Sequence, residues 1–242
     1  MARYRRLAAL LGAVLLAAAL AACGGGDGGN DERPAVTISD EDLAAMVPTK
    51  ADLGQAFAGY QESGAPDTNE GRLERADDPD DERSDQQTFG RVTGYDRELQ
   101  VSASTVQADA PLLIHLGVTL LEDSDGTSGY LNDDVADIEA RVGRTGLGPL
   151  LETVAPYEVT PLGDESLGLR SRASVTPEQG ETQTLYVTYF WFRRDRIIGD
   201  VALGRFDDTD LSQQAQSIAV LLDERIRQVL AGLATPSPTS TP

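Results

Sequence analysis

The fold is decided by residues 184–206, which read TLYVTYFWFRRDRIIGDVALGRF. Two runs rich in apolar, aromatic and β-branched residues, 184–193 and 196–206, are separated by a short charged break at Arg194 and Asp195. Runs of this composition and length favour β-strands, and a short polar break between two of them favours a hairpin. The segment therefore predicts two antiparallel strands joined by a tight turn.

Aromatic side chains are concentrated in the first of these strands. Because successive side chains of a strand point to opposite faces, Tyr186, Phe190 and Phe192 fall on one face, and Tyr189 and Trp191 fall on the other. One face is expected to pack beneath a helix, and ordinary sheet packing could bury the second face as well. If the second face is open, Tyr189 and Trp191 are the candidate ligand-binding residues, for a small apolar or glycan ligand.

A helix is expected immediately after the hairpin. Asp207, Asp208 and Asp210 suit the positive end of a helix dipole, and Gly232 suits a C-terminal cap. Between them, apolar residues recur at helical spacing, at Leu211, Ala215, Ile218, Ala219, Leu222, Ile226, Val229 and Leu230. This pattern predicts an amphipathic helix that covers one face of the sheet.

The preceding part of the chain shows a similar order of strands and helix. Alternating apolar residues predict strands over 97–106 and 112–121, helical spacing predicts a helix over 131–142, and a further strand is expected over 167–175. Two strand–helix units suggest an α+β fold, with an antiparallel β-sheet and helices packed mainly on one face. We expect a single domain over residues 35–233, and a distant internal duplication is a further hypothesis.

Two short helices and an acidic segment precede these elements. Ser39 and Thr49 are each followed three residues later by an aspartate, the pattern of a capping box at the start of a helix. Residues 61–88 are rich in acids and contain few aliphatic side chains. Such a segment buries too little apolar surface to offset the entropy lost on ordering. It is therefore predicted to be an acidic mobile loop.

Residues 1–22 have the layout of a lipoprotein signal peptide. Arginines precede an apolar run that is too short for a stable membrane span. The run ends in Leu20-Ala21-Ala22-Cys23, which resembles the lipobox of bacterial lipoproteins. The resemblance implies cleavage before Cys23 and attachment of a lipid, with fatty acids such as palmitate, to this residue. Cys23 is the only cysteine in the chain, so an intramolecular disulfide is excluded.

The flanking segments and the charge suggest where the domain is held. Residues 23–34 are rich in glycine and predict a flexible tether, and the Pro/Ser/Thr-rich residues 234–242 predict a disordered tail. A net charge of −20 at pH 7 disfavours nucleic acid as a partner and repels an anionic membrane surface. We expect a domain on the extracytoplasmic face of the cell membrane, attached through its lipid anchor, with the outer membrane as the alternative in a two-membrane cell.

The sequence contains few signs of catalytic chemistry. His115 is the only histidine, and it falls on the strand face opposite the aliphatic row, where a structural role is expected. A Gly-x-Ser-x-Gly nucleophile motif is absent from the sequence, and among 40 acidic residues a pair of carboxylates is no evidence for a glycosidase. Residues 123–126 begin like a calcium loop but lack the closing glutamate. We therefore predict no catalytic residue, metal site, cofactor or enzymatic activity.

Three short motifs carry a second resemblance. They are Gly163-Asp164-Glu165-Ser166 before a strand, Phe192-Arg193-Arg194 at the end of another, and Leu222-Asp223-Glu224-Arg225-Ile226 in the last helix. This layout resembles small envelope domains of bacterial lipoproteins and the extracellular sensor regions of PknH-type kinases, over residues 40–232 in outline. Those sensor regions usually carry disulfides, whereas this chain has a single cysteine and cannot form a disulfide within itself. The resemblance implies a ligand-binding or sensing domain, and it transfers no ligand or site residue.

These observations favour a membrane-anchored, extracytoplasmic module for ligand binding or sensor-like interaction. Its expected partners are the membrane, a small apolar or glycan ligand, and an envelope protein. An envelope hydrolase that uses His115 or a carboxylate pair is one alternative. A passive structural or assembly lipoprotein is the other.

Overall fold

The predicted hairpin consists of β6 (Gln183–Arg194) and β7 (Ile197–Arg205). The strands are antiparallel, and the chain reverses through Asp195, whose φ of 54° lies in the left-handed region. Aspartate adopts this region more readily than most residues. The backbone N–H of Asp195 donates to Oδ2 of Asp164 at 2.7 Å, which holds the turn in place.

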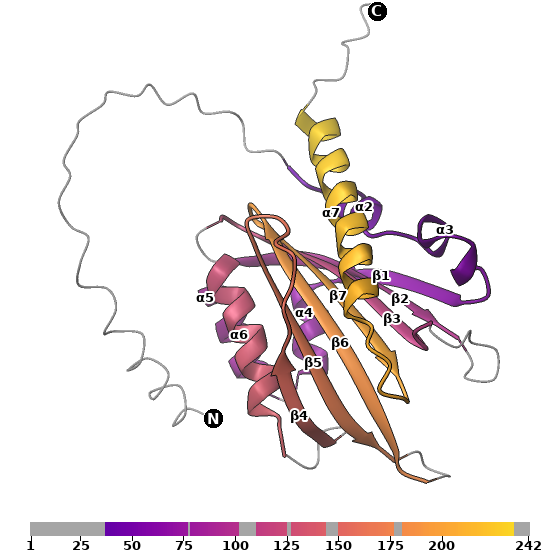
Figure 1. The fold of residues 1–242 in the computed structure, drawn as a ribbon. Helices are drawn as coiled ribbons and strands as arrows, with labels where there is room; N and C mark the ends of the chain where they lie inside the picture. Colours follow the sequence, from indigo (N-terminus) through magenta and orange to yellow (C-terminus); the bar gives the residue numbers. More distant parts are fainter. Residues whose placement is uncertain are drawn as a thin grey trace, which may run out of the picture. The chain divides into compact units, whose positions relative to one another are not determined.

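The computed structural model describes residues 37–76, 78–101, 110–124, 127–143, 150–176 and 181–234. Within these ranges, the hairpin belongs to a seven-stranded antiparallel sheet with the order β1-β2-β3-β7-β6-β5-β4 (Figure 1). The other strands are β1 (Gln61–Asp67), β2 (Arg91–Gln100), β3 (Leu113–Leu121), β4 (Leu150–Pro156) and β5 (Glu165–Val175). The helices are α2 (Asp40–Met46), α3 (Lys50–Leu53), η2 (Gln55–Phe57), α4 (Asn69–Arg75), α5 (Pro79–Thr88), α6 (Thr127–Ala140) and α7 (Ser212–Ala234).

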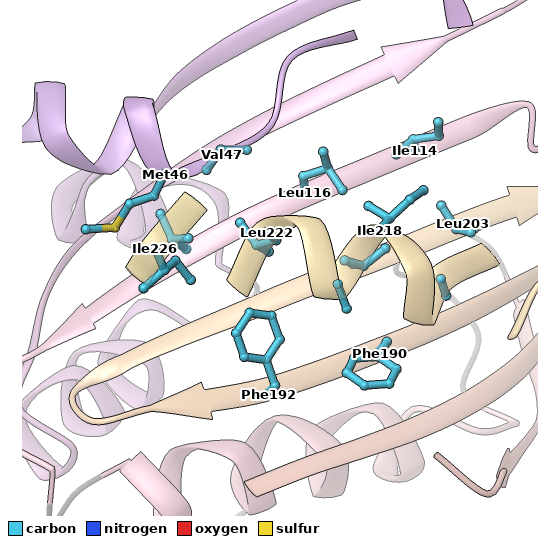
Figure 2. Packing of buried hydrophobic residues seen from close by; sticks show 14 of the residues in the cluster. Met46, Val47, Ile114, Leu116, Phe190, Phe192, Leu203, Ile218, Leu222 and Ile226 are labelled. Carbon is cyan, nitrogen blue, oxygen red and sulfur yellow. The ribbon is translucent and has the colours of Figure 1, made fainter. Parts of the chain in front are cut away.

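The larger hydrophobic core lies on the face of the sheet that α7 and α2 cover. Phe190 and Phe192 of β6 point toward α7, beside Leu222 (Figure 2). The aliphatic row of β3 joins the same core, with Leu116 fully buried. The two faces predicted for the aromatic residues of β6 are therefore confirmed, because Phe190 and Phe192 lie in this core and Trp191 lies in another cluster.

A smaller cluster lies on the opposite face. It contains Leu121, Tyr130, Leu131, Leu169, Trp191 and Ile198, and it includes residues of α6. In Figure 1, α4 and α5 lie on the same side of the sheet as α6. The predicted α+β class and the antiparallel sheet are confirmed. The main core is on one face as expected, while α4, α5 and α6 provide a second, partial cover on the other.

Several elements lie where the sequence pattern places them. The structure confirms β3, β5, α6 and α7, and it shows both capping boxes, at Ser39 and Thr49. Strand β2 begins at Arg91, ahead of the expected strand over 97–106. Residues 102–106 of that expected strand lie outside the described residues.

The interpretation of residues 61–88 as a mobile loop is wrong, since the segment forms β1, α4 and α5. Polar contacts, and not the burial of apolar side chains, keep this segment ordered. Asp67 is only 5% exposed and forms ion pairs with Arg72, Arg75 and Arg91. Such contacts are formed by residues that look hydrophilic in a sequence, so composition alone suggested a solvated loop.

The termini are not part of the described structure. Residues 1–36 include the predicted signal peptide, Cys23 and the tether, and residues 235–242 include most of the predicted tail. In the ranges that are described, no helix combines the length and the apolar character needed to cross a membrane.

Candidate functional site

A cavity of about 500 Å³ lies on the sheet face opposite the main core. Strands β2, β3, β6 and β7 supply its floor, and residues from α4, α5 and the α6 region complete its wall. The lining residues are Asp67, Arg72, Arg75, Ala76, Glu82, Asp96, His115, Thr119, Tyr130, Arg141, Tyr189, Trp191, Ile198, Asp200, Val201 and Ala202. Polar and aromatic side chains from separate parts of the chain therefore meet at one place.

Strand register explains why the floor is hollow. In one row across the sheet, Gly117 of β3 lies between Asp96 of β2 and Asp200 of β7. In the next row, Ala202 of β7 pairs with His115 of β3. A Cβ atom on Gly117 would lie 2.3 Å from Oδ1 of Asp200, so the glycine provides the space that this carboxylate occupies.

His115 lies between two carboxylates on this floor. Its Nε2 is 3.2 Å from Oδ2 of Asp200 and 3.8 Å from Oδ1 of Asp96. The side chains of His115, Asp96 and Asp200 are 32%, 37% and 22% exposed. The three groups are therefore accessible from the cavity, and the position of His115 on the face opposite the aliphatic row is as predicted.

The carboxylates change the acid–base behaviour of the imidazole. Burial alone would lower the pKa of His115, but the hydrogen bond to Asp200 and the charges of Asp200, Asp96 and Glu98 raise it to about 9. Burial and the charge of Asp200 raise the pKa of Asp96 to about 6, although the charge of His115 opposes this shift. At neutral pH the floor thus holds a charged imidazole among carboxylates.

Tyr189 and Trp191 form the aromatic part of the wall. Their rings are stacked, with centroids 5.1 Å apart and an interplanar angle of 8°. The two candidate ligand-binding residues thus lie together at the cavity. Trp191 is only 6% exposed and packs in the smaller cluster, whereas Tyr189 is half-buried. Tyr189 is therefore the more accessible of the two.

Arginines of α4 lie at the side of the cavity nearest β1 and β2. Arg75 pairs with Asp67 at 2.5 Å, and Arg72 contacts both Asp67, at 3.5 Å, and Glu82, at 3.0 Å. Arg91, which lies on β2, also pairs with Asp67, at 2.5 Å. Asp67 thus orients Arg72 and Arg75, which belong to residues 61–88, the segment predicted to be a loop.

Sequence reasoning missed most of the charged members of this site. Asp96 and Asp200 lie on strands far apart in the chain, and only the pairing of β3 with both β2 and β7 brings them to His115. Alternation along each strand could have shown that Asp96 and Asp200 lie on the same face as His115. The order of the strands in the sheet, however, could not be predicted from the spacing of residues in the sequence. Among the described residues that line the cavity, none is a serine that could pair with His115.

Comparison with known proteins shows a likeness of fold. The extracellular domain of PknH from Mycobacterium tuberculosis matches with a TM-score of 0.52 and 10% sequence identity, over 79% of this chain and 97% of that chain. At this identity the likeness concerns the fold alone. No protein-family model matches the sequence. No curated protein matches it either.

Proposed function

We propose that this chain is a lipid-anchored, extracytoplasmic ligand-binding module, and that its ligand occupies the cavity around His115 and Tyr189. The proposal depends mainly on one observation, the accessible cavity in which aromatic and charged side chains converge. Its volume lies in the range of about 300–1,000 Å³ that is typical of small-molecule sites. The fold likeness to an extracellular domain is consistent with a sensor-like role outside the cytoplasm.

The lining favours a hydroxyl-rich ligand such as a short glycan over a small apolar one. An apolar ligand would remove water from Asp96, Asp200 and His115 without replacing the lost hydrogen bonds, which is costly. Sugar hydroxyls both donate and accept hydrogen bonds, so they can satisfy carboxylates and an imidazolium together. The half-buried Tyr189 ring offers an apolar surface for the C–H face of a sugar.

The glycan proposal predicts saturable binding that depends on Tyr189. Trp191 is the only tryptophan and lines the cavity, so its fluorescence reports on this site directly. We expect at least one sugar in a panel of neutral, acidic and amino disaccharides to change this fluorescence in the full chain purified in detergent. Tyr189→Ala should weaken that binding at least about tenfold, roughly 1.4 kcal/mol.

Tyr186→Ala is the matched control, because Tyr186 lies on the same strand but lines a different hollow. It should leave the affinity unchanged. A panel without any saturable response at millimolar concentration, or equal losses in both tyrosine variants, would contradict the proposed ligand site.

The anchor is tested separately from the ligand. Cys23→Ser removes the thiol to which the lipid would be attached, so labelling with a radioactive or clickable fatty acid should disappear. Once residues 1–22 have been removed, the protein should move from the membrane fraction to the soluble extracytoplasmic fraction, because the lipid is the membrane attachment in this proposal. A variant that still incorporates fatty acid would refute the assignment of Cys23.

A further inference from the structure

An arginine without a carboxylate partner lies at the aromatic side of the cavity. Arg141 directly follows α6 and lines the cavity together with Tyr189 and Trp191. Among the described residues, no carboxylate forms an ion pair with its guanidinium. Burial raises the pKa of Tyr189, and the positive charge of Arg141 is one of the influences that oppose this shift. An uncompensated positive charge therefore lies near the tyrosine ring.

The end of α6 fixes the backbone of this arginine. The backbone N–H of Arg141 donates to the carbonyl oxygen of Ile138 at 3.2 Å. Ile138 packs against the smaller hydrophobic cluster, which contains Trp191. The backbone of Arg141 is thus tied to the same cluster as the aromatic wall, while its side chain is exposed.

The other basic side chains of the lining already have carboxylate partners. Arg72 and Arg75 pair with Asp67, and Nε2 of His115 lies 3.2 Å from Oδ2 of Asp200. An anionic group of a ligand would compete with these contacts. At the unpaired arginine it would compete only with water.

The lining is also less acidic than the chain as a whole. In the sequence, 40 acidic residues stand against 20 lysines and arginines. The described lining has four acidic and four basic side chains, with His115 counted as basic because its pKa is raised to about 9. An anion therefore meets less repulsion in this cavity than the net charge of the chain suggests.

The floor separates the unpaired arginine from the carboxylates. In one row across the sheet, the small residue Ala202 lies between His115 and Tyr189. Because neighbouring strands lie about 4.8 Å apart, the backbones of His115 and Tyr189 are separated by about 9.6 Å. The Asp200 carboxylate extends over Gly117 of β3, away from Tyr189. A ligand above Ala202 can therefore place an anionic group at one end and hydroxyl groups at the other.

We propose that the ligand is an acidic saccharide of the uronic acid class, whose carboxylate pairs with Arg141 while a sugar ring lies against Tyr189. This inference depends on the proposed function, because it specifies the ligand of the same cavity. The planar guanidinium matches a carboxylate in a two-point contact. A phosphate monoester carries up to about two negative charges, so one unpaired arginine does not neutralise it.

The test compares each acidic sugar with an uncharged form of itself. Disaccharides of galacturonic, glucuronic and mannuronic acid, and the methyl ester of each, are titrated into the full chain in detergent while Trp191 fluorescence is recorded. We expect at least one acid to bind about tenfold more tightly than its ester, since hydrogen bonds to charged groups are stronger than neutral ones. Raising the salt concentration from about 0.1 M to about 1 M should weaken the acid and not the ester.

Variants of Arg141 assign this preference to one side chain. Arg141→Gln should lower the affinity for the acid to that of the ester and leave the ester unaffected, whereas Arg141→Lys should retain part of the preference. The side chain is exposed, so neither substitution should change stability by more than about 0.5 kcal/mol. Rejection of the ester by its bulk alone would persist in Arg141→Gln, which separates charge pairing from shape.

Arg83→Gln is the matched control. Arg83 is also an exposed arginine, but it pairs with Asp80 on α5 and is not among the described residues that line the cavity. This variant should keep the full preference for the acid.

The outcomes separate this inference from the proposed function. Equal affinity for acid and ester, or a preference that survives in Arg141→Gln, would overturn the inference. Saturable binding of neutral or amino sugars without any uronic acid would overturn it too, while the proposed ligand site would stand. A panel in which no sugar binds would refute the proposed function, and the inference with it.

Discussion

Asp67→Asn is expected to lower the free energy of unfolding by about 3–5 kcal/mol, the usual cost of removing one partner from a buried ion pair. Asp67 is 5% exposed and Arg91 is 4% exposed, so the guanidinium that loses its carboxylate cannot turn to water. Arg75 and Arg72 lose the same partner. Asparagine keeps the volume of the side chain, which isolates the effect of charge. Urea unfolding followed by circular dichroism measures the change.

Asp80→Asn is the control for this prediction. Asp80 also pairs with an arginine, Arg83 at 2.6 Å, but its side chain is 92% exposed. Exposed pairs contribute about 0–1 kcal/mol, so this variant should remain close to the wild-type stability. Similar losses in the two variants would show that burial of Asp67 is not what makes its ion pairs important.

Phe190→Ala is expected to destabilise the domain by a similar amount, about 3–5 kcal/mol. Phe190 is fully buried where β6 meets α7, so its removal leaves a cavity in the main core in addition to the lost transfer energy (Figure 2). The midpoint of urea unfolding should fall. The slope of the free energy of unfolding against urea concentration should change little if the unfolded state is unaffected.

Phe206→Ala removes the same ring from the surface. Phe206 is 45% exposed, just beyond the end of β7, and surface substitutions usually change stability by no more than about 0.5 kcal/mol. Equal destabilisation by both substitutions would contradict the assignment of the main core to the α7 face.

The sequence was sufficient for the elements that bury apolar side chains in a regular pattern. Strand β3 alternates Ile114 and Leu116 with polar or small residues, and α7 presents an apolar face to the sheet. The edge strands β1 and β4 lack this alternation, because most of their residues are exposed or only partly buried. Helices α4 and α5 were missed for a different reason, since caps and ion pairs order them more than apolar burial does.

The candidate site was predictable only in part. Tyr189 and Trp191 were found because aromatic residues are conspicuous in a strand, and the face that carries His115 followed from alternation. Asp96 and Asp200 gave no such signal among 40 acidic residues. Their importance comes from strand order, which places β3 beside β7 across a long stretch of intervening sequence.

The pairing of β3 with β7 also has a consequence for folding and turnover. It joins residues 113–120 to residues 197–204, so the cavity floor is assembled only when distant segments of the chain have come together. Contacts of such long sequence separation slow folding, because loop-closure entropy must be overcome before they form. A molecule bound across this junction stabilises only the assembled state, by an amount that grows with the logarithm of its concentration. Occupancy of the cavity would then set how often the domain opens to proteases, and so how long each copy survives.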